Sequence, residues 1–319
     1  MDRMRGGKSA GMSTVLLLFL LTATLLPAGT VHAQNSFPLA DLVPFPRGGA
    51  LGGQAFGGDL LAAGIDPTVA VEEGPTLELA GGSHLLDLSW ASAGAHIPVG
   101  GRSMVFVLST LSYGTQFRTG MDDRLGLFGG SFTPSDLNLS GSTVLLQGGG
   151  TTIGVGITLL YGQLDDLRAF GLSAALGVRQ EVGVLQVRGG ISNLGTVISA
   201  YGVKSGTRIP PRLRAGLGVP FGGDRWEAST EILYRAGDRK VGWSSGVEWL
   251  PIENAALRMG FIQGDAGGVV SDNTLSDAGL TAGLAIWFSE WRVSWVYRSG
   301  GVLGSSHLLA LGWSLDPLR

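Results

Sequence analysis

The chain has 319 residues, 22 basic and 25 acidic side chains, a formal net charge of -3 and no cysteine. The lack of cysteine excludes a disulfide framework and a thiolate metal site, and the absence of a lysine or arginine cluster argues against nucleic acid as a partner. The mean hydropathy of +0.28 is high for a water-soluble protein, yet after the first 33 residues no apolar run is long enough for a membrane-spanning helix.

The chain begins with a predicted secretory signal peptide, residues 1–33. Basic residues at positions 3–8 precede an uncharged apolar stretch at 14–26, and small residues stand before a cleavage point after Ala33. We therefore expect export through the general secretory pathway and a mature chain that starts at about Gln34.

The next segment, residues 34–74, does not read as a spanning strand. It carries prolines, glycine pairs and a short apolar run from Leu60 to Ile65. Two roles remain open for it: a periplasmic tail, or a plug folded into the lumen of the barrel predicted below. Because a narrow barrel with small lumenal residues leaves space to fill, we favour at least partial insertion.

From residue 75 to residue 319 the sequence alternates large apolar residues with small or polar ones, which is typical of β-strands. About fourteen segments follow this pattern, most of them near the length that a tilted strand needs to cross a bilayer. They are 75–82, 85–97, 102–113, 135–146, 151–162, 168–180, 183–193, 211–220, 225–235, 240–250, 254–262, 278–288, 291–298 and 306–315. The 54 glycines also favour turns and crowded strands over helices.

The lengths of the connections distinguish a transmembrane barrel from a soluble sandwich, which has the same alternation. Every second connection is short, as in QGGG or PIEN, whereas the long ones, 114–134, 194–210 and 263–277, all fall on the other side. Outer-membrane barrels have short periplasmic turns and longer surface loops. The sequence therefore predicts an all-β fold, a fourteen-stranded antiparallel transmembrane β-barrel in contact with outer-membrane lipid.

Charged side chains within the predicted strands fall on the face opposite the large apolar residues, which we assign to the lumen. They are Asp87, Arg188, Arg212, Arg214, Glu227, Glu231, Glu248, Arg258 and Arg292. An arginine or lysine facing lipid at mid-membrane would cost about 2–4 kcal/mol, so this placement supports the barrel. Two interpretations remain open: a charged, selective pore, or a mixed-sign network of ion pairs that helps to close the barrel.

Four tryptophans collect at the end with the short turns. Trp249, Trp287 and Trp291 flank two of these turns, and Trp313 lies at the same end of the last strand. Because tryptophan is enriched at membrane interfaces, we interpret the four as an aromatic girdle on the periplasmic side. In a soluble barrel they would be core residues.

A catalytic or metal site is hard to build from this sequence. Beyond the signal peptide the histidines are His84, His96 and His307, and the predicted strand order places the first two at opposite rims. Beyond the signal peptide no glycine pair is followed by Lys-Ser or Lys-Thr, so none forms a phosphate loop. We therefore expect no enzymatic activity, no cofactor and no metal.

Several blocks of the sequence resemble a known family. They are FPRGGALGGQAF (45–56) followed by DPTVA (66–70), GGSFTPSDLNLSGS (129–142), YGQLDDLRAFGLSAALG (161–177), ISNLGTVISAYG (191–202) and IPPRLRAGLG (209–218). In order and spacing they are similar to the PorV/PorQ family, PorQ most of all, over most of residues 37–250. That family usually has Asn-Pro-Ala-Gly or similar after the glycine-rich block, where this chain has Asp66-Pro67-Thr68-Val69.

This resemblance implies a barrel of the kind seen in FadL-like long-chain fatty-acid channels, in the outer membrane of a two-membrane bacterium. It also implies a non-enzymatic role in type IX-like protein secretion or in the attachment of exported proteins at the cell surface. The implied partners are cargo proteins with C-terminal sorting domains, or other secretion components. The alternative is a FadL-like channel for the uptake of small hydrophobic compounds, with the N-terminal segment as a hatch and an apolar pocket inside.

The end of the chain points to the route of assembly. GWSL (312–315) resembles the ending by which the barrel-assembly machinery recognises its clients, although the chain continues through Asp316–Arg319. The alternating segment before it is expected to pair with the first strand, which closes the barrel and leaves no free edge.

Overall fold

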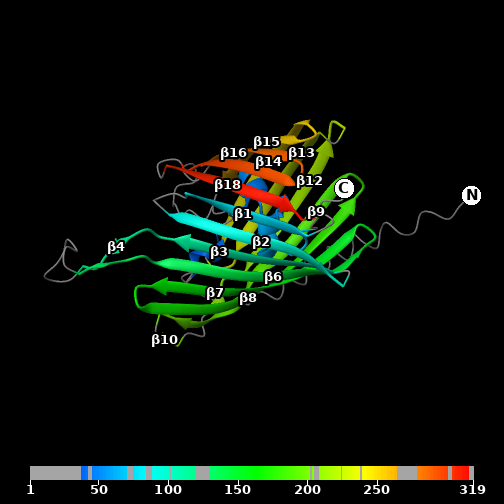
Figure 1. Cartoon of the computed structure of the whole chain (residues 1–319). Helices are drawn as coiled ribbons and strands as arrows, with labels where there is room; N and C mark the ends of the chain where they lie inside the picture. Colours follow the sequence, from blue (N-terminus) through cyan, green and yellow to red (C-terminus); the bar gives the residue numbers. More distant parts are fainter. Residues whose placement is uncertain are drawn as a thin grey trace, which may run out of the picture.

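Fourteen antiparallel strands form one closed sheet, because the last strand of the chain, β18, pairs with the first, β1 (Figure 1). The computed structural model describes residues 37–41, 45–69, 75–83, 88–100, 102–119, 129–201, 203–204, 208–223, 225–237, 239–263, 279–300 and 304–315. The predicted all-β, fourteen-stranded antiparallel barrel is confirmed. The predicted signal peptide lies outside the described residues.

The wall consists of long strands that follow one another around the barrel. They are β1 (Thr76–Ser83), β2 (Ser89–Val99), β3 (Arg102–Ser112), β6 (Ser135–Gly148), β7 (Thr151–Leu164), β8 (Leu167–Val182), β9 (Leu185–Ala200), β12 (Arg212–Phe221), β13 (Trp226–Arg235), β14 (Lys240–Ile252), β15 (Ala255–Gln263), β16 (Gly279–Phe288), β17 (Trp291–Ser299) and β18 (Ser305–Ser314). Each strand is paired with its neighbour in chain order, apart from short accessory strands near the loops.

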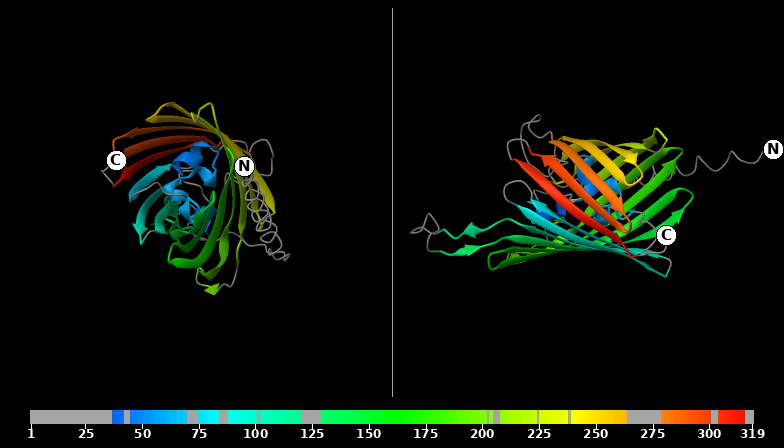
Figure 2. Two further views of the ribbon diagram at one scale, coloured as in Figure 1. Left: turned by 90° about the vertical axis from the view of Figure 1, so that its right-hand side faces the viewer. Right: turned by 45° about the horizontal axis from the view of Figure 1, so that its top comes forward.

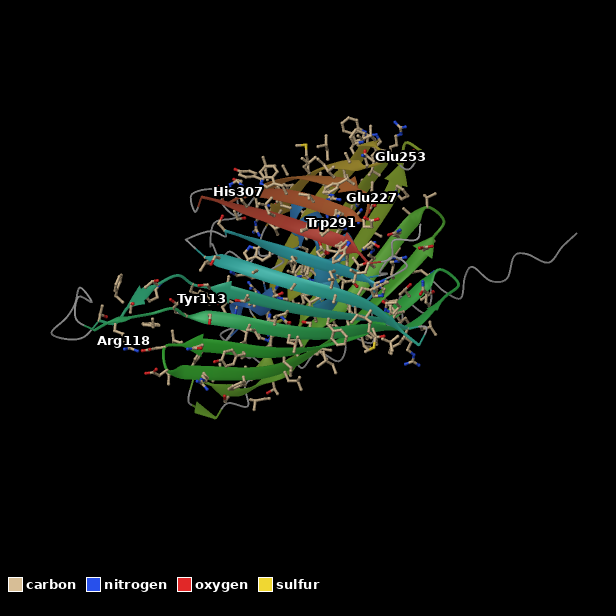
Figure 3. The ribbon with its side chains drawn as sticks, in the orientation of Figure 1. Tyr113, Arg118, Glu227, Glu253, Trp291 and His307 are labelled. Atoms are coloured by element: carbon tan, nitrogen blue, oxygen red, sulfur yellow. The ribbon has the colours of Figure 1, made fainter. Side chains whose placement is uncertain are left out.

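The two ends of the barrel differ in their connections, as predicted. One end, called the turn end here, carries the connections 100–101, 149–150, 183–184, 222–225, 253–254 and 289–290. The opposite end, called the loop end, carries 84–88, 113–134, 165–166, 201–211, 236–239, 264–278 and 300–304. Figure 3 shows Arg118 and His307 towards the loop end and Glu253 towards the turn end.

Two of the three predicted long loops contain strands of their own. The connection 113–134 forms a hairpin of β4 (Gln116–Phe117) and β5 (Ser131–Phe132), which projects beyond the wall (Figure 1). The connection 201–211 contains β10 (Val203–Lys204) and β11 (Arg208–Ile209), which both pair with β9. The third, predicted at 263–277, lies outside the described residues except for its first residue.

The outward-facing side chains of the wall are apolar. In β18, Leu309 is 62% exposed while its neighbour Leu308 is 7% exposed, because successive residues of a strand point to opposite faces. The same alternation holds along most of the wall, so that leucine, isoleucine, valine and aromatic side chains cover its outside. Such a surface is suited to lipid. In the part of the chain that the structure describes, no helix has the length and apolarity needed to cross a membrane.

The N-terminal segment lies inside the ring of strands (Figure 2, left). Its residues 37–41 and 45–69, called the plug here, form only short helical turns: η1 (Pro38–Asp41), α2 (Pro46–Ala50), η2 (Ala55–Gly57) and η3 (Leu60–Gly64). Of the two roles left open by the sequence, a tail or a plug, the described part of this segment occupies the lumen. It runs from Phe37 near the loop end to Val69 near the turn end.

Strand β9 departs most from its prediction. The predicted strand ended at residue 193, whereas β9 continues to Ala200. Asn193 has φ +60°, and the pairing of β8 with β9 shifts register there. This bulge changes the phase of the alternation, because Ile191 pairs with Leu176 whereas Leu194 pairs with Ala174 on the same face of β8. Odd-numbered positions of β9 before the bulge and even-numbered positions after it thus share the outer face. A prediction based on strict alternation therefore ends the strand at the bulge.

Candidate functional site

A ring of inward-facing glycines in the wall receives the plug. At each of them an added Cβ would come within 2.1 to 2.8 Å of a plug atom, which is closer than real Cβ contacts. These glycines, called the glycine girdle here, are Gly94, Gly154, Gly171, Gly177, Gly216, Gly246, Gly260 and Gly283. They lie on strands from all sides of the barrel, so the plug touches the wall around its circumference.

The segment Asp66-Pro67-Thr68 docks directly on this girdle. A Cβ on Gly154 would lie 2.1 Å from the Pro67 carbonyl oxygen, and one on Gly177 would lie 2.8 Å from the Thr68 side chain. The Asp66 carboxylate accepts hydrogen bonds from the backbone N–H of Thr68 at 3.0 Å and from its hydroxyl at 2.6 Å. Aspartate and threonine thus form a compact turn at the place where the PorV/PorQ family usually has Asn-Pro-Ala-Gly.

Arg47 is the main charged contact between plug and wall. Its guanidinium binds the carboxylates of Glu227 and Glu248, and Glu248 also accepts a hydrogen bond from Arg258 at 2.5 Å. Within the plug, Asp59 accepts hydrogen bonds from the backbone N–H groups of Arg47 and of Gly48, the latter at 2.8 Å. These contacts satisfy the free N–H groups at the start of α2 and fix the position of Arg47.

A second set of polar contacts holds the middle of the plug. Glu231 of β13 accepts a hydrogen bond from the Phe56 N–H at 3.1 Å, and its other oxygen pairs with Arg214. Arg188 donates to the Phe56 carbonyl oxygen. On β16, the Thr281 hydroxyl donates to the Ala50 carbonyl oxygen at 2.7 Å. Backbone groups of Phe56 and Ala50 are thus bonded by side chains of the wall.

Most of the predicted lumenal charges therefore contact the plug or another inward-facing charge. Arg188, Glu227, Glu231 and Glu248 bind the plug directly, while Arg214 and Arg258 pair with the glutamates that do so. Two further members lie elsewhere: Arg292 pairs with Glu78 at 2.7 Å, and Arg212 is 2% exposed within β12. Asp87 lies outside the described residues.

Three charged residues of these contacts were not predicted from the sequence. They are Arg47, Asp59 and Glu78. Glu78 could have been found, because Thr76, Glu78 and Ala80 alternate with Leu77 and Leu79 and so share the polar face. The plug has no such period, and the Arg47 contact spans 201 positions of the sequence. No pattern within the plug identifies the partners of Arg47 and Asp59.

The four predicted girdle tryptophans do not all face the same way. Trp291 and Trp313 stack on the outside of the wall, with ring centroids 5.1 Å apart and planes at 7°, and Trp249 stacks in the same manner on Trp226. Trp287 differs, because it shares the inward face of β16 with Thr281 and Ala285. It borders a pocket, together with parts of Trp291 and Trp313. The alternation of β16 places the Trp287 side chain inside the barrel. The prediction that it belongs to the aromatic girdle rested only on its closeness to a turn.

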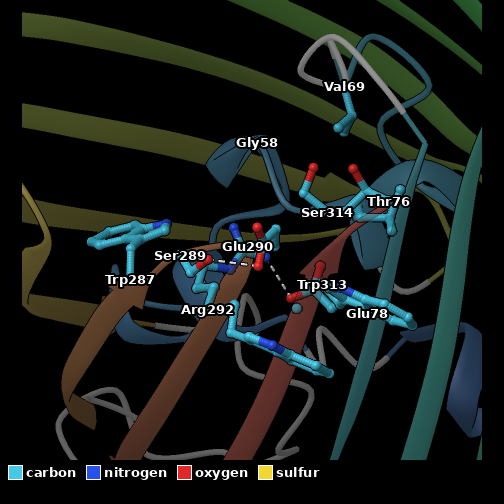
Figure 4. A pocket seen from close by; sticks show the side chains of 13 residues that line it. Gly58, Val69, Thr76, Glu78, Trp287, Ser289, Glu290, Arg292, Trp313 and Ser314 are labelled. Atoms are coloured by element: carbon cyan, nitrogen blue, oxygen red, sulfur yellow. Dashed lines mark hydrogen bonds and ion pairs between the residues drawn. The ribbon is translucent and has the colours of Figure 1, made fainter. Parts of the chain in front are cut away.

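This pocket lies at the turn end, between the plug and the wall (Figure 4). Its volume is about 260 Å³. Gly58, Leu60 and Val69 of the plug line one side, and Trp287, Arg292 and Glu78 of the wall line the other. The lining is therefore part apolar and part charged.

The histidines do not form a cluster. His96 is buried at the turn end and His307 lies outside near the loop end, whereas His84 lies outside the described residues. Among the residues that the structure describes, no group of three or more histidine, cysteine, aspartate or glutamate side chains could hold a metal ion.

Solved structures with the same architecture include channels for hydrocarbons. The chain is similar to a TodX deltaS2S3 mutant, a monoaromatic hydrocarbon channel, with a TM-score of 0.65 and 13% identity over 85% of this chain and 98% of that one. It is similar to the toluene transporter TodX of Pseudomonas putida, with a TM-score of 0.59 and 11% identity over 88% and 96%. A FadL homologue of Pseudomonas aeruginosa gives a TM-score of 0.54 and 10% identity over 86% and 99%.

These likenesses establish the fold. The chain is a fourteen-stranded antiparallel barrel of the FadL-like type, as the sequence resemblance implied. They lend no specific support to the PorV/PorQ family or to secretion. No family model and no curated protein matches the sequence.

Proposed function

We propose that this protein is a FadL-like channel in the outer membrane for the uptake of small hydrophobic compounds. The observation that carries the proposal is the likeness of the whole barrel to TodX, which is described as a monoaromatic hydrocarbon channel and a toluene transporter. An apolar outer wall suits such a barrel to the outer membrane.

The plug supports selectivity against hydrated solutes. It occupies the lumen in the described part of the chain, and its backbone and side chains lie against the glycine girdle. A sugar or an ion would have to pass with its hydration shell through a lumen that is already filled. The pocket at the turn end is small and partly apolar, which favours compact molecules with little polar surface.

Uptake by whole cells tests this proposal. The protein would be expressed in the outer membrane of a bacterial host that lacks channels of this fold, and the initial rate of uptake of radiolabelled toluene would be compared with that of host cells. We expect faster toluene uptake and unchanged uptake of a sugar such as arabinose. Unchanged toluene uptake in cells that hold the folded barrel would refute the proposal.

The secretion role implied by the sequence blocks stays a prediction. It requires that the loop end engages exported proteins, so the test is to shorten the connection 113–134, which carries the projecting hairpin. If the protein serves secretion, the shortened form should lose surface display of cargo proteins and keep its toluene uptake. The reverse result would favour the channel alone.

A further inference from the structure

Asp136 of β6 connects the projecting β4–β5 hairpin to the plug. Its side chain is 2% exposed, and one of its carboxylate oxygens, Oδ2, accepts two hydrogen bonds. One comes from the Tyr113 hydroxyl at 2.8 Å and the other from the backbone N–H of Leu39 at 3.2 Å. Tyr113 stands at the base of the hairpin, and Leu39 belongs to η1, the first turn of the plug. A single oxygen thus holds two segments that lie far apart in the chain.

The hairpin is anchored at its base and again farther out. At the base, the Tyr113 N–H donates to the Pro134 carbonyl oxygen at 3.0 Å. Farther out, Arg118 donates to Asp165 in the turn between β7 and β8 at 2.8 Å, and these two side chains are 46% and 30% exposed. Figure 3 shows Tyr113 where the hairpin leaves the wall and Arg118 farther along it. Because an exposed ion pair contributes little free energy, this outer contact is easily released.

The turn η1 has little stability of its own. It has four residues, Pro38–Asp41, and a helical segment of this length does not persist without tertiary contacts. Its contacts are the hydrogen bond from Leu39 to Asp136 and an apolar cluster in which the Phe37 ring, 0% exposed, packs with residues such as Leu160. A segment held by so few contacts opens locally while the rest of the fold stays intact.

The shared oxygen makes the two hydrogen bonds interdependent. A buried carboxylate that loses one of its donors is destabilised where it stands. If the hairpin swings outward and takes the Tyr113 hydroxyl with it, the Asp136 carboxylate gains by turning towards water. The N–H of Leu39, a residue that is 3% exposed, then loses its acceptor, which opposes the docking of η1.

We propose that the surface hairpin controls the docking of η1 through Asp136. With the hairpin bound to Asp165, Tyr113 and Asp136 hold η1 against the wall; with the hairpin released, η1 leaves the wall and frees the part of the lumen that it fills. A molecule that binds the released hairpin at the loop end thereby acts on the plug without entering the lumen. This coupling goes beyond the proposed function, because it concerns the position of the plug and not the compound that passes.

The lack of cysteine in the chain allows a direct test by thiol labelling. Ala40 of η1 is 8% exposed, so Ala40→Cys supplies a thiol that a maleimide reaches when η1 has left the wall. In the full protein purified in detergent, Arg118→Met should raise the labelling rate of this thiol about two- to fivefold, the factor that an exposed ion pair supplies. An unchanged rate would overturn the proposal.

Two controls show whether the effect is specific. Arg179→Met breaks the Arg179–Glu181 pair near the turn end and should leave the labelling of Ala40→Cys unchanged. Ala55→Cys places the thiol in the middle of the plug, at a residue that is 0% exposed, and Arg118→Met should not expose it. Equal labelling at both plug positions would mean that the plug leaves as a whole, which contradicts a separate response of η1.

Tyr113→Phe tests the step through Asp136, because it keeps the ring and removes only the hydroxyl. In this background Arg118→Met should no longer change the labelling rate of Ala40→Cys. If the two- to fivefold rise persisted, the hairpin would act on η1 by another route and Asp136 would not be the link.

A second measurement uses the reciprocity of coupled sites. Phe37→Ala weakens the docking of η1 and changes no residue of the wall, and it should raise the hydrogen exchange of the hairpin amides about two- to fivefold. Unchanged exchange would contradict the coupling. Because labelling and exchange report the plug and the hairpin, they can succeed while toluene uptake fails, and the reverse, so the two proposals are separable.

Discussion

Arg47 of the plug grips Glu248 of β14 with two parallel hydrogen bonds, from Nε to Oε2 and from Nη2 to Oε1, each 3.0 Å long. The Glu248 side chain is 10% exposed and that of Arg47 is 20% exposed. A bidentate pair of this kind fixes the orientation as well as the distance of its partners. It therefore sets how the plug is turned within the lumen.

The first prediction concerns this pair. Arg47→Met should destabilise the protein by about 3 kcal/mol, because Glu227 and Glu248 lose a partner in a largely buried place, although Glu248 keeps Arg258. Urea unfolding of the barrel in lipid vesicles measures the loss. Arg179→Met, which breaks the exposed pair with Glu181, is the control and should cost less than about 1 kcal/mol. If both variants lost the same free energy of unfolding, the Arg47 contacts would stabilise the protein no more than the exposed pair does.

The glycine girdle gives the second prediction. A Cβ on Gly260 would lie 2.2 Å from the Gly52 nitrogen, whereas one on Gly148 would meet nothing within 4 Å. Gly260→Ala should therefore displace the plug at a cost of about 1–3 kcal/mol, and Gly148→Ala should change little. Limited proteolysis of the plug measures the displacement. If both variants were cut at the rate of the unchanged protein, the contact would not be as tight as described.

A third prediction tests the orientation of the wall. Leu309 lies on the outer face midway along β18, so Leu309→Arg should lower the stability of the folded barrel in vesicles by about 2–4 kcal/mol. Ser305→Arg, at the loop end of the same strand, should cost about 0–1 kcal/mol. Heat-modifiable migration on a denaturing gel reports the folded fraction. A purified protein that stays soluble without detergent would contradict the membrane assignment.

The fourth prediction concerns pH and the loop end. Arg118 of the β4–β5 hairpin donates a hydrogen bond to Asp165 between β7 and β8 at 2.8 Å, and this bond lowers the pKa of Asp165 below its ordinary value of 3.8. A lowered pKa means that the pair stabilises the docked hairpin above pH 3.8 and that this contribution is lost as the pH falls through the lowered value.

Hydrogen exchange of the hairpin amides should therefore rise relative to the wall, after correction for the intrinsic rates, once the pH passes below this window. High salt should act in the same direction at neutral pH, because both partners are exposed. Asp165→Asn should remove both effects. If the variant and the unchanged protein responded alike, the hairpin would be held by other contacts.

The sequence predicts the wall well because the wall obeys one rule. Alternation with period two, together with the lengths of the connections, yields fourteen strands, their order and the face on which Glu231, Glu248 and Arg258 lie. The rule fails where its phase changes, as at Asn193 in β9. The prediction for Trp287 was wrong for a different reason. Trp287 was assigned to the aromatic girdle because it lies close to a turn, although the alternation places its side chain inside the barrel.

The interior was much less predictable. The plug sequence shows no regular alternation of apolar and polar residues. Its position depends on contacts between residues far apart in the chain, such as Arg47 with Glu248. The glycines were interpreted as turns and close packing. The sequence does not show what these glycines pack against. A glycine on a strand indicates close packing, but it does not identify the group that fills the space of its missing side chain.

The glycine girdle makes the plug an internal spacer. A closed ring of fourteen strands can be round or flattened without a change in its pairing, and the strands alone do not decide between these shapes. Here Leu61 of the plug rests against Gly94 on one side, and Phe56, Leu51 and Ala50 rest against Gly216, Gly246 and Gly283 on others, so opposite walls stand apart by the width of the plug. The shape of the barrel's cross-section is thus set largely by the plug, a segment that contributes no strand to the wall.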